Sequence, residues 1–137
     1  MTMFVDSSAW YALADRGDTE HARATAVLRG SEVLMTTDHV LVETWLLINS
    51  RLDRNAANSF WRNLREGVAE IEHVERADIE LAWHIGEHFS DQDFSIVDRT
   101  SFVVMERLGL KRVASFDDDF AIYRYGTRRD KAFEVLR

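Results

Sequence analysis

The chain has 137 residues, a length that favours one domain, residues 1–137, built around one hydrophobic core. Hydrophobic residues make up 46% and charged residues 30%, which is typical of a globular protein and leaves no apolar stretch long enough to span a membrane. The absence of cysteine excludes disulfide bonds and thiolate metal sites, and the net charge of −7 is unusual for a protein that binds nucleic acid.

Short apolar runs alternate with longer segments of helical periodicity. We expect a strand at 3–5 followed at once by a helix, a helix from about 19 to 30, a strand at 32–37, helices at 38–48 and 53–67, a strand at 69–74, helices at 75–89 and 95–108, and strands at 112–116 and 132–136. Asp18 or Thr19, Asp38, Asp53 and Ser95 are the expected helix caps. Strands separated by helices predict an α/β fold, a three-layer α/β/α arrangement with a central, mainly parallel sheet of four to five strands.

Two acidic residues directly follow expected strands. Asp6 follows the strand at 3–5, and Asp117 follows the strand at 112–116. In parallel sheets the ligand site lies beyond the carboxyl ends of the strands, so both side chains are expected at that edge. Asp98 lies one turn into the helix that begins at Ser95. Glu43 interrupts an otherwise apolar helix and is therefore expected to point inward.

Carboxylates gathered at one edge need compensation. Two of them about 4 Å apart repel by roughly 4 kcal/mol at an effective dielectric constant of about 20. Either protons or cations must offset this repulsion, and oxygen ligands without cysteine favour Mg²⁺ or Mn²⁺. One or two such ions can activate water and stabilise the leaving oxygen of a phosphodiester.

Each acid also has a purely structural interpretation. Asp6 is able to cap the first helix, and Asp98 to close a capping box with Ser95. Asp117 is able to cap a short helical turn, and Glu43 to pair with a buried arginine. The common position of Asp6 and Asp117, together with two acids on apolar helices, favours a shared metal site over four separate roles.

Four segments carry these acids in order. They are Phe4-Val5-Asp6-Ser7-Ser8-Ala9-Trp10, Thr37-Asp38-His39-Val40-Leu41-Val42-Glu43, Phe94-Ser95-Ile96-Val97-Asp98 and Ala114-Ser115-Phe116-Asp117-Asp118-Asp119-Phe120. Their order and spacing, from residue 3 to about residue 136, resemble the PIN-domain family, and within it the VapC-like toxins of bacterial and archaeal toxin–antitoxin pairs. None of these motifs is specific for the family on its own, but all four in this order and spacing are.

The resemblance implies a metal-dependent endoribonuclease that cleaves RNA to leave 3′-hydroxyl and 5′-phosphate ends. It further implies a supporting role for Ser8 and an accessory metal-binding role for Asp119, with Asp118 left as the alternative. A homodimer held inactive by an antitoxin, whose tail covers the site, is the expected assembly. The metal ligands that it implies are Asp6, Glu43, Asp98 and Asp117.

The acidity of the chain is compatible with RNA as substrate. Of the 17 basic residues, 15 are arginine, whose planar guanidinium group suits phosphate, and metal ions would offset part of the acidic charge. No signal-peptide pattern precedes Asp6, which fits a cytoplasmic protein without a membrane anchor. The candidate phosphate-guiding residues are Arg51, Arg54, Arg62 and Arg65 in one group and Arg124, Arg128, Arg129 and Lys131 in another. A solvated charged face is the favoured interpretation of the first group, whereas solvation and RNA contact are equally favoured for the second.

Three other interpretations compete with the nuclease. His84, Glu87 and His88 match the H-x-x-E-H zinc motif, although a solvated helix face explains them better. A phosphatase that uses Asp6 as nucleophile expects a second Asp two residues on, where Ser8 stands. A PIN-fold protein that processes or binds RNA without a toxin role is the third.

Overall fold

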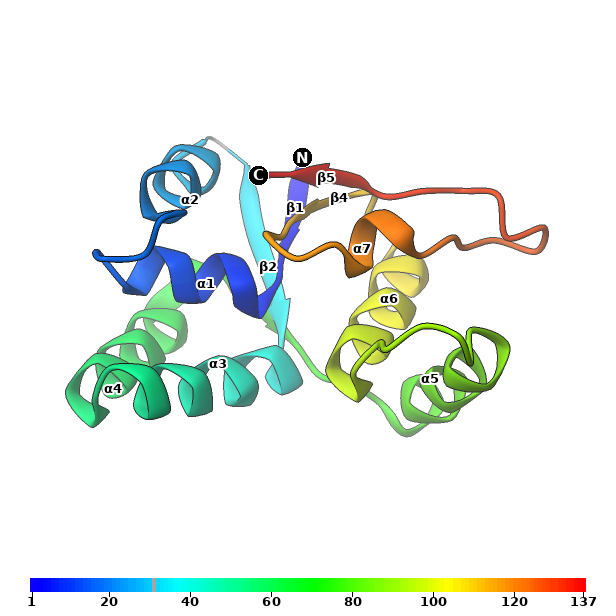
Figure 1. Ribbon diagram of the computed structural model, residues 1–137, viewed down its shortest axis with the longest axis horizontal. Helices are drawn as coiled ribbons and strands as arrows, with labels where there is room; N and C mark the ends of the chain where they lie inside the picture. Colours follow the sequence, from blue (N-terminus) through cyan, green and yellow to red (C-terminus); the bar gives the residue numbers. More distant parts are fainter. Residues whose placement is uncertain (31) are drawn as a thin grey trace.

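The computed structural model describes residues 1–30 and 32–137 and contains one five-stranded sheet (Figure 1). The strand order is β3-β2-β1-β4-β5, and every neighbouring pair of strands is parallel. The strands are β1 (Thr2–Val5), β2 (Val33–Thr37), β3 (Glu70–Glu72), β4 (Arg112–Ala114) and β5 (Glu134–Leu136). All five predicted strands are therefore confirmed, with β3, β4 and β5 shorter than expected.

Helices cover both faces of the sheet. In Figure 1, α1 to α4 lie on one side and α5 to α7 on the other, which confirms the three-layer α/β/α arrangement. The helices are α1 (Ser7–Ala14), α2 (His21–Leu28), α3 (Asp38–Arg51), α4 (Arg54–Asn63), a π-helical turn (Leu64–Val68), α5 (Arg76–His88), α6 (Ile96–Leu108) and α7 (Asp119–Ile122). Within the described ranges, none of them combines the length and apolarity needed to cross a bilayer.

Helix α3 begins one residue earlier than its predicted cap implies. Thr37, with extended backbone angles, is the N-cap, and its hydroxyl accepts a hydrogen bond from the Val40 amide at 3.1 Å. Asp38 was expected in that role but is the first helical residue. Its carboxylate instead accepts from the Val74 amide at 3.0 Å, which ties the end of β3 to the start of α3.

Helix α2 begins later than predicted, so the proposed caps at Asp18 and Thr19 are wrong. Asp18 forms a local turn instead, in which its carboxylate accepts from the Glu20 amide at 2.8 Å. The helix starts at His21 after Glu20. The predicted caps at Asp53 and Ser95 are confirmed, because each side chain accepts an amide hydrogen bond from the first turn of its helix.

The order of the strands reverses between β1 and β4. The chain builds β1, β2 and β3 in one direction and then returns to place β4 and β5 on the other side of β1. Val5 is paired with Ala114, and the Asp6 amide donates to the Ala114 carbonyl at 3.1 Å. The carboxyl ends of two adjacent strands thus diverge into different layers at one point, where α/β proteins hold their ligands.

An aromatic cluster packs α6 against α7 and the residues that flank the two helices. The ring of Phe102 stacks on Tyr123 with 4.1 Å between centroids and meets the edges of Phe94 and Phe120 at 5.2 and 4.9 Å. Such pairs contribute about 0.5–1.5 kcal/mol each beyond their burial. Because Phe102 lies one turn beyond Asp98 on α6, this packing also fixes the position of the Asp98 carboxylate.

Asp78 of α5 is the buried partner of Arg107 on α6, and we expect Asp78→Ala to destabilise the fold by about 3 kcal/mol. Asp78 is 2% exposed and accepts from Arg107 Nε at 3.0 Å and Nη2 at 2.9 Å. It also accepts from the Glu75 amide, which closes the capping box of α5. Urea unfolding measures the loss. Exposed Glu80 on the same helix gives the matched control, Glu80→Ala, and equal losses for the two variants would contradict the prediction.

Candidate metal centre

Asp6 lies at the end of β1 and is almost fully buried, with 1% of its surface exposed. Its Oδ2 atom accepts from the hydroxyls of Ser8 at 2.8 Å and Ser115 at 3.0 Å. Its Oδ1 atom is buried too, yet no described residue donates a hydrogen bond to it. A buried carboxylate oxygen without a partner is costly, so this atom needs a proton or a cation.

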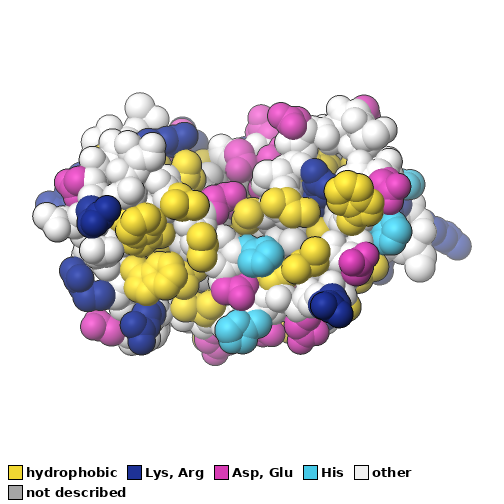
Figure 2. Space-filling view, turned by 90° about the horizontal axis from the view of Figure 1, so that it is seen from below, with side chains coloured by type: hydrophobic (Ala, Val, Ile, Leu, Met, Phe, Trp, Pro, Cys, Tyr) yellow, Lys and Arg dark blue, Asp and Glu magenta, His cyan; other side chains and the backbone are white. Residues whose placement is uncertain are grey.

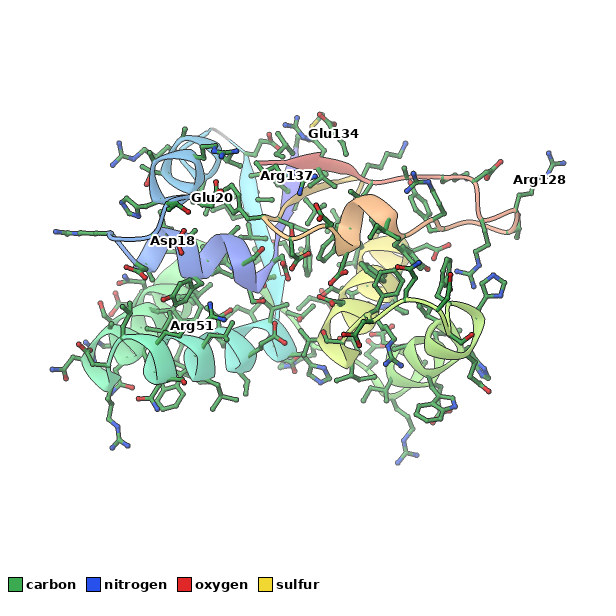
Figure 3. All side chains as sticks on the ribbon, in the orientation of Figure 1. Asp18, Glu20, Arg51, Arg128, Glu134 and Arg137 are labelled. Carbon is green, nitrogen blue, oxygen red and sulfur yellow. The ribbon has the colours of Figure 1, made fainter. Side chains whose placement is uncertain are left out.

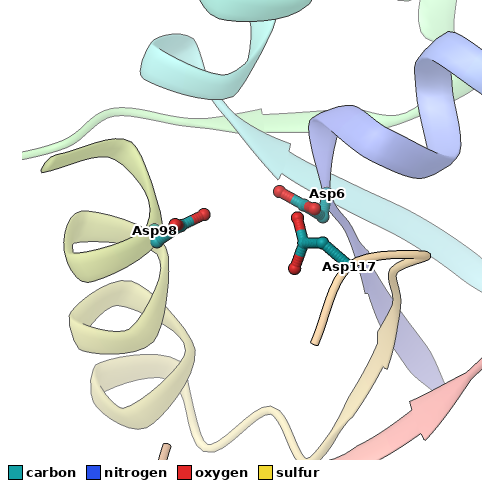
Figure 4. Close-up of side chains that lie close together, drawn as sticks. All are labelled: Asp6, Asp98 and Asp117. Atoms are coloured by element: carbon teal, nitrogen blue, oxygen red, sulfur yellow. The ribbon is translucent and has the colours of Figure 1, made fainter. Parts of the chain in front are cut away.

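Asp98 and Asp117 bring two more carboxylates to the same place. One oxygen atom from each of Asp6, Asp98 and Asp117 lies within 4.8 Å of the other two. Figure 4 shows Asp6 and Asp117 side by side at the ends of their strands, with Asp98 facing them from α6. Oxygen ligands lie about 2.0–2.6 Å from Mg²⁺ or Ca²⁺, so the ligands of one ion are separated by at most about 5 Å. The three carboxylates therefore fit one hard divalent cation.

The electrostatics of the cluster favour a cation as well. Burial raises the pKa of Asp6 to about 7, and the negative charge of Asp117 adds to the shift. Burial also raises the pKa of Asp98 to about 8, helped by the hydrogen bond that it forms with Asp119 and by the charge of Asp6. Without a cation, protons occupy part of this site near neutral pH. A divalent ion would replace them.

Glu43 lies at the border of this cluster. It is half-buried on α3, and its carboxylate accepts a hydrogen bond from the Ser7 hydroxyl at the start of α1. It is not part of the group formed by Asp6, Asp98 and Asp117. None of the ion pairs among the described residues involves Glu43, so the alternative of a buried arginine partner has no support there.

The structure distinguishes Asp119 from Asp118. Asp119 is half-buried and hydrogen-bonded to Asp98, and burial raises its pKa. Asp118 is exposed and pairs with Arg137 at 3.0 Å. Of these two acids, Asp119 is the one that contacts the cluster, through Asp98.

Two serines orient Asp6. Ser8 donates to Asp6 and accepts from the Phe116 amide at 2.9 Å, which ties the loop after β4 to the end of β1. Ser115 is fully buried, and its hydroxyl lies 3.0 Å from Asp6 Oδ2 and 3.3 Å from Asp117 Oδ1. Ser115 was not among the site residues predicted from the sequence. The sequence feature that could have identified it is a hydroxyl residue at the end of a buried strand, two positions before Asp117.

Asp6 and Asp98 also perform the capping roles predicted for them as alternatives. Asp6 is the N-cap residue of α1, and Asp98 closes the capping box of α6 by accepting from the Ser95 amide at 3.0 Å. Asp117 accepts from the Asp119 amide at 3.2 Å, but the N-cap residue of α7 is Asp118, so the cap predicted at Asp117 is wrong. Capping and clustering are thus compatible, because each cap uses only part of the acceptor capacity of a carboxylate.

The sequence pattern of the PIN domain family matches residues 3–124. The chain belongs to the PIN domain family. It is 38% identical over 120 residues to the 23S rRNA-specific endonuclease VapC20 of Mycobacterium tuberculosis, covering 87% of this chain and 92% of that protein. It is 27% identical over 116 residues to ribonuclease VapC26 of the same species, covering 84% and 86% of the two chains.

Solved structures agree with this assignment. The crystal structure of Mycobacterium tuberculosis VapC20, described as a Sarcin-Ricin loop cleaving toxin, superposes with a TM-score of 0.83 at 37% identity. That match covers 87% of this chain and 92% of the other. FitAcB from Neisseria gonorrhoeae superposes with a TM-score of 0.66 at 16% identity over 100% of this chain and 97% of the other, a likeness of fold alone.

The histidine motif lies outside the acidic cluster of this PIN domain. His84 and Glu87 are exposed on α5 and pair with each other at 3.2 Å, whereas the ring of His88 meets the edge of Phe89. Among the described residues, neither histidine joins a group of metal-type ligands. The solvated helix face is therefore the better interpretation of this motif.

The basic segment after α7 is partly used inside the PIN domain. Arg124 donates to the backbone carbonyls of Ala121, Ile122 and Tyr123, and Arg129 donates to the Tyr123 hydroxyl. Exposed Arg128 lies at the far end of this segment in Figure 3, and Lys131 is also exposed. Of the second predicted phosphate-guiding group, only Arg128 and Lys131 are therefore fully exposed to solvent.

Proposed function

We propose that the chain is a metal-dependent endoribonuclease whose residues 1–137 form a single nuclease domain. The observation that carries the proposal is the group of three carboxylates at the reversal point of the sheet, with the buried Oδ1 atom of Asp6 lacking a protein partner. Relatives named as endonuclease and ribonuclease support RNA as the substrate class. The proposed active-site residues are Asp6, Glu43, Asp98 and Asp117, with Asp119 as accessory ligand and Ser8 in support.

Each residue has a proposed part in the reaction. Asp6, Asp98 and Asp117 hold the ion, and Ser8 keeps Asp6 in place. We assign to Glu43 the task of orienting the attacking water or accepting a proton from it, and its hydrogen bond with Ser7 at the border of the cluster supports this role. When bound, Mg²⁺ or Mn²⁺ would lower the pKa of that water and offset the charge that develops on the phosphodiester.

The partners follow from the family. We propose the toxin of a VapBC-type pair, acting in the cytoplasm as a homodimer and held inactive by an antitoxin. Apolar side chains lie exposed across the face that Figure 2 presents, which offers area for such contacts. Val42, Leu46 and Trp83 are 49%, 57% and 62% exposed. Since VapC20 carries the name of a 23S rRNA-specific endonuclease, ribosomal RNA is the first substrate to test.

The test is an incubation of the purified protein with intact ribosomes and with free 23S rRNA, in Mn²⁺ and in EDTA. We expect discrete cleavage in Mn²⁺, with 3′-hydroxyl and 5′-phosphate ends, and none in EDTA. Cleavage that continues in EDTA would contradict metal dependence. RNA binding without cleavage would favour a PIN-fold RNA-binding protein, and cleavage without growth arrest on expression would favour RNA processing over a toxin role.

A phosphatase with Asp6 as nucleophile has no comparable support. Such an enzyme needs a second acid near the nucleophile to protonate the leaving group. Residue 8 is a serine whose hydroxyl donates to Asp6 and accepts from the Phe116 amide. Through these hydrogen bonds Ser8 orients Asp6. The Ser8 hydroxyl is unsuited to protonate a leaving group.

A further inference from the structure

A cleft of about 300 Å³ opens beside the metal centre. Ser7, Ser8 and Asp117 line one part of it, and Tyr11 and Arg51 line another. Because it shares Ser8 and Asp117 with the metal centre, a ligand that fills the cleft also reaches the candidate active site. The volume lies at the lower end of the range for small-molecule sites, which suits a single nucleotide.

Arg51 is the cation of this cleft. It lies at the end of α3, with its guanidinium carbon 5.0 Å from the centroid of the Tyr11 ring. The Tyr11 hydroxyl donates to Asp15 at 2.8 Å, which fixes the ring beneath the guanidinium group. Arg51 takes part in none of the ion pairs found among residues 1–30 and 32–137. Its donors therefore remain free for an anion from outside the chain.

Two further acids line the cleft but do not neutralise Arg51. Glu20 pairs with Arg23 at 3.0 Å, and Asp18 accepts from the Glu20 amide at 2.8 Å. Figure 3 shows Asp18 and Glu20 on one side of α1 and Arg51 on the other. Asp117 forms no ion pair among the described residues. The cleft therefore carries more negative than positive charge and repels a polyanion. A divalent ion bound to Asp117 would offset the charge of that carboxylate and weaken this repulsion.

We propose that this cleft is the subsite for the nucleotide next to the scissile phosphate, and that Arg51 binds the phosphate of that nucleotide. The inference rests on the proposed function and deepens it by assigning a substrate-binding residue outside the acidic motifs. A stacked guanidinium group is suited to the task, since its planar donors match phosphate oxygens and its orientation is already restricted. RNA should therefore bind in the cleft more tightly when the metal centre holds its ion.

The test measures the binding of a short fluorescent single-stranded RNA by anisotropy, with Ca²⁺ as a non-cleaving ion. Arg51→Ala is expected to weaken binding about tenfold, and Arg51→Gln to behave alike. The slope of log affinity against log salt should fall by about 0.7, the value of one phosphate contact on a single strand. In Mn²⁺, KM for cleavage should rise by a similar factor with kcat little changed. Arg76→Ala, at an exposed position of α5 outside the cleft and outside both basic groups, is the matched control and should change none of these.

The outcomes separate this inference from the proposed function. If wild type cleaves RNA and Arg51→Ala matches it in affinity, salt slope and KM, the subsite assignment is overturned. The same holds if RNA binds equally well in EDTA and in Ca²⁺. If wild type neither binds nor cleaves RNA, the proposed function itself fails. Equal melting temperatures for the Arg51 and Arg76 variants exclude a folding defect as the cause of weaker binding.

Discussion

Asp6→Asn is expected to lower RNA cleavage by about a thousandfold or more while leaving the fold intact. A bound metal ion lowers the barrier by several kcal/mol, and every 1.36 kcal/mol is a factor of ten in rate. The substitution replaces one proposed ligand oxygen with an amide nitrogen, which cannot bind the ion. Asparagine has the same shape and caps helices as well as aspartate does. Its oxygen can still accept from Ser8 and Ser115, so the local structure should persist.

The same substitution should stabilise the metal-free protein at neutral pH. It removes a buried carboxyl whose pKa is about 7, and with it the repulsion from Asp117. Asp118→Asn is the matched control, because Asp118 lies in the neighbouring acidic run but is exposed and pairs with Arg137. Cleavage rates on 23S rRNA and thermal melting in EDTA measure both effects. Wild-type cleavage by Asp6→Asn, in a preparation free of other nucleases, would refute the proposed metal site.

The affinity for Mn²⁺ is expected to rise steeply between pH 6 and pH 8. A carboxyl must lose its proton before it binds a cation, so apparent affinity rises about tenfold per pH unit for each proton displaced. The pKa values of about 7 for Asp6 and about 8 for Asp98 place this titration near neutrality. Calorimetric titration with Mn²⁺ in buffers of different ionisation enthalpy measures both the affinity and the protons released. An affinity that is constant over this range would contradict the assignment.

The stability of the metal-free protein should fall as the pH rises, whereas the affinity for Mn²⁺ increases. Asp6 and Asp98 have raised pKa values in the folded state, so over this range the folded state binds more protons than the unfolded state does. Their contribution to stability is complete below pH 4, near the ordinary aspartate pKa, and is lost as the pH rises through about 7 and 8. Melting in EDTA should therefore occur at a higher temperature at pH 5 than at pH 8. Mn²⁺ should remove most of that difference.

Much of the candidate site could be predicted because local sequence rules specify it. Asp6 and Asp117 follow buried strands, and parallel strands place the residues after them at one edge of a sheet. Asp98 stands three residues after Ser95, and this spacing gives both a capping box and a fixed place in the first turn of α6. These positions depend on interactions within a few residues, which the sequence displays directly.

Other parts of the site depend on contacts between distant segments. The choice between Asp118 and Asp119 is made by Arg137 on one side and by Asp98 on the other. Glu43 bonds to Ser7, 36 residues away, and Ser115 reaches Asp6 across two strands. Helix α2 begins after the predicted caps because a turn at Asp18 takes precedence. No pattern of neighbouring residues contains this information.

The sequence by itself determined the α/β class, the order of the strands and helices along the chain, and the identity of the acids at the strand ends. Periodicity and capping act within a turn or a strand, so they can be recognised without coordinates. The tertiary structure alone decided that three carboxylates meet within 4.8 Å, that one buried oxygen lacks a partner, and that Arg51 joins the adjacent cleft. These facts depend on how β1, β4, α3 and α6 pack together, and burial then sets the charge state of the site.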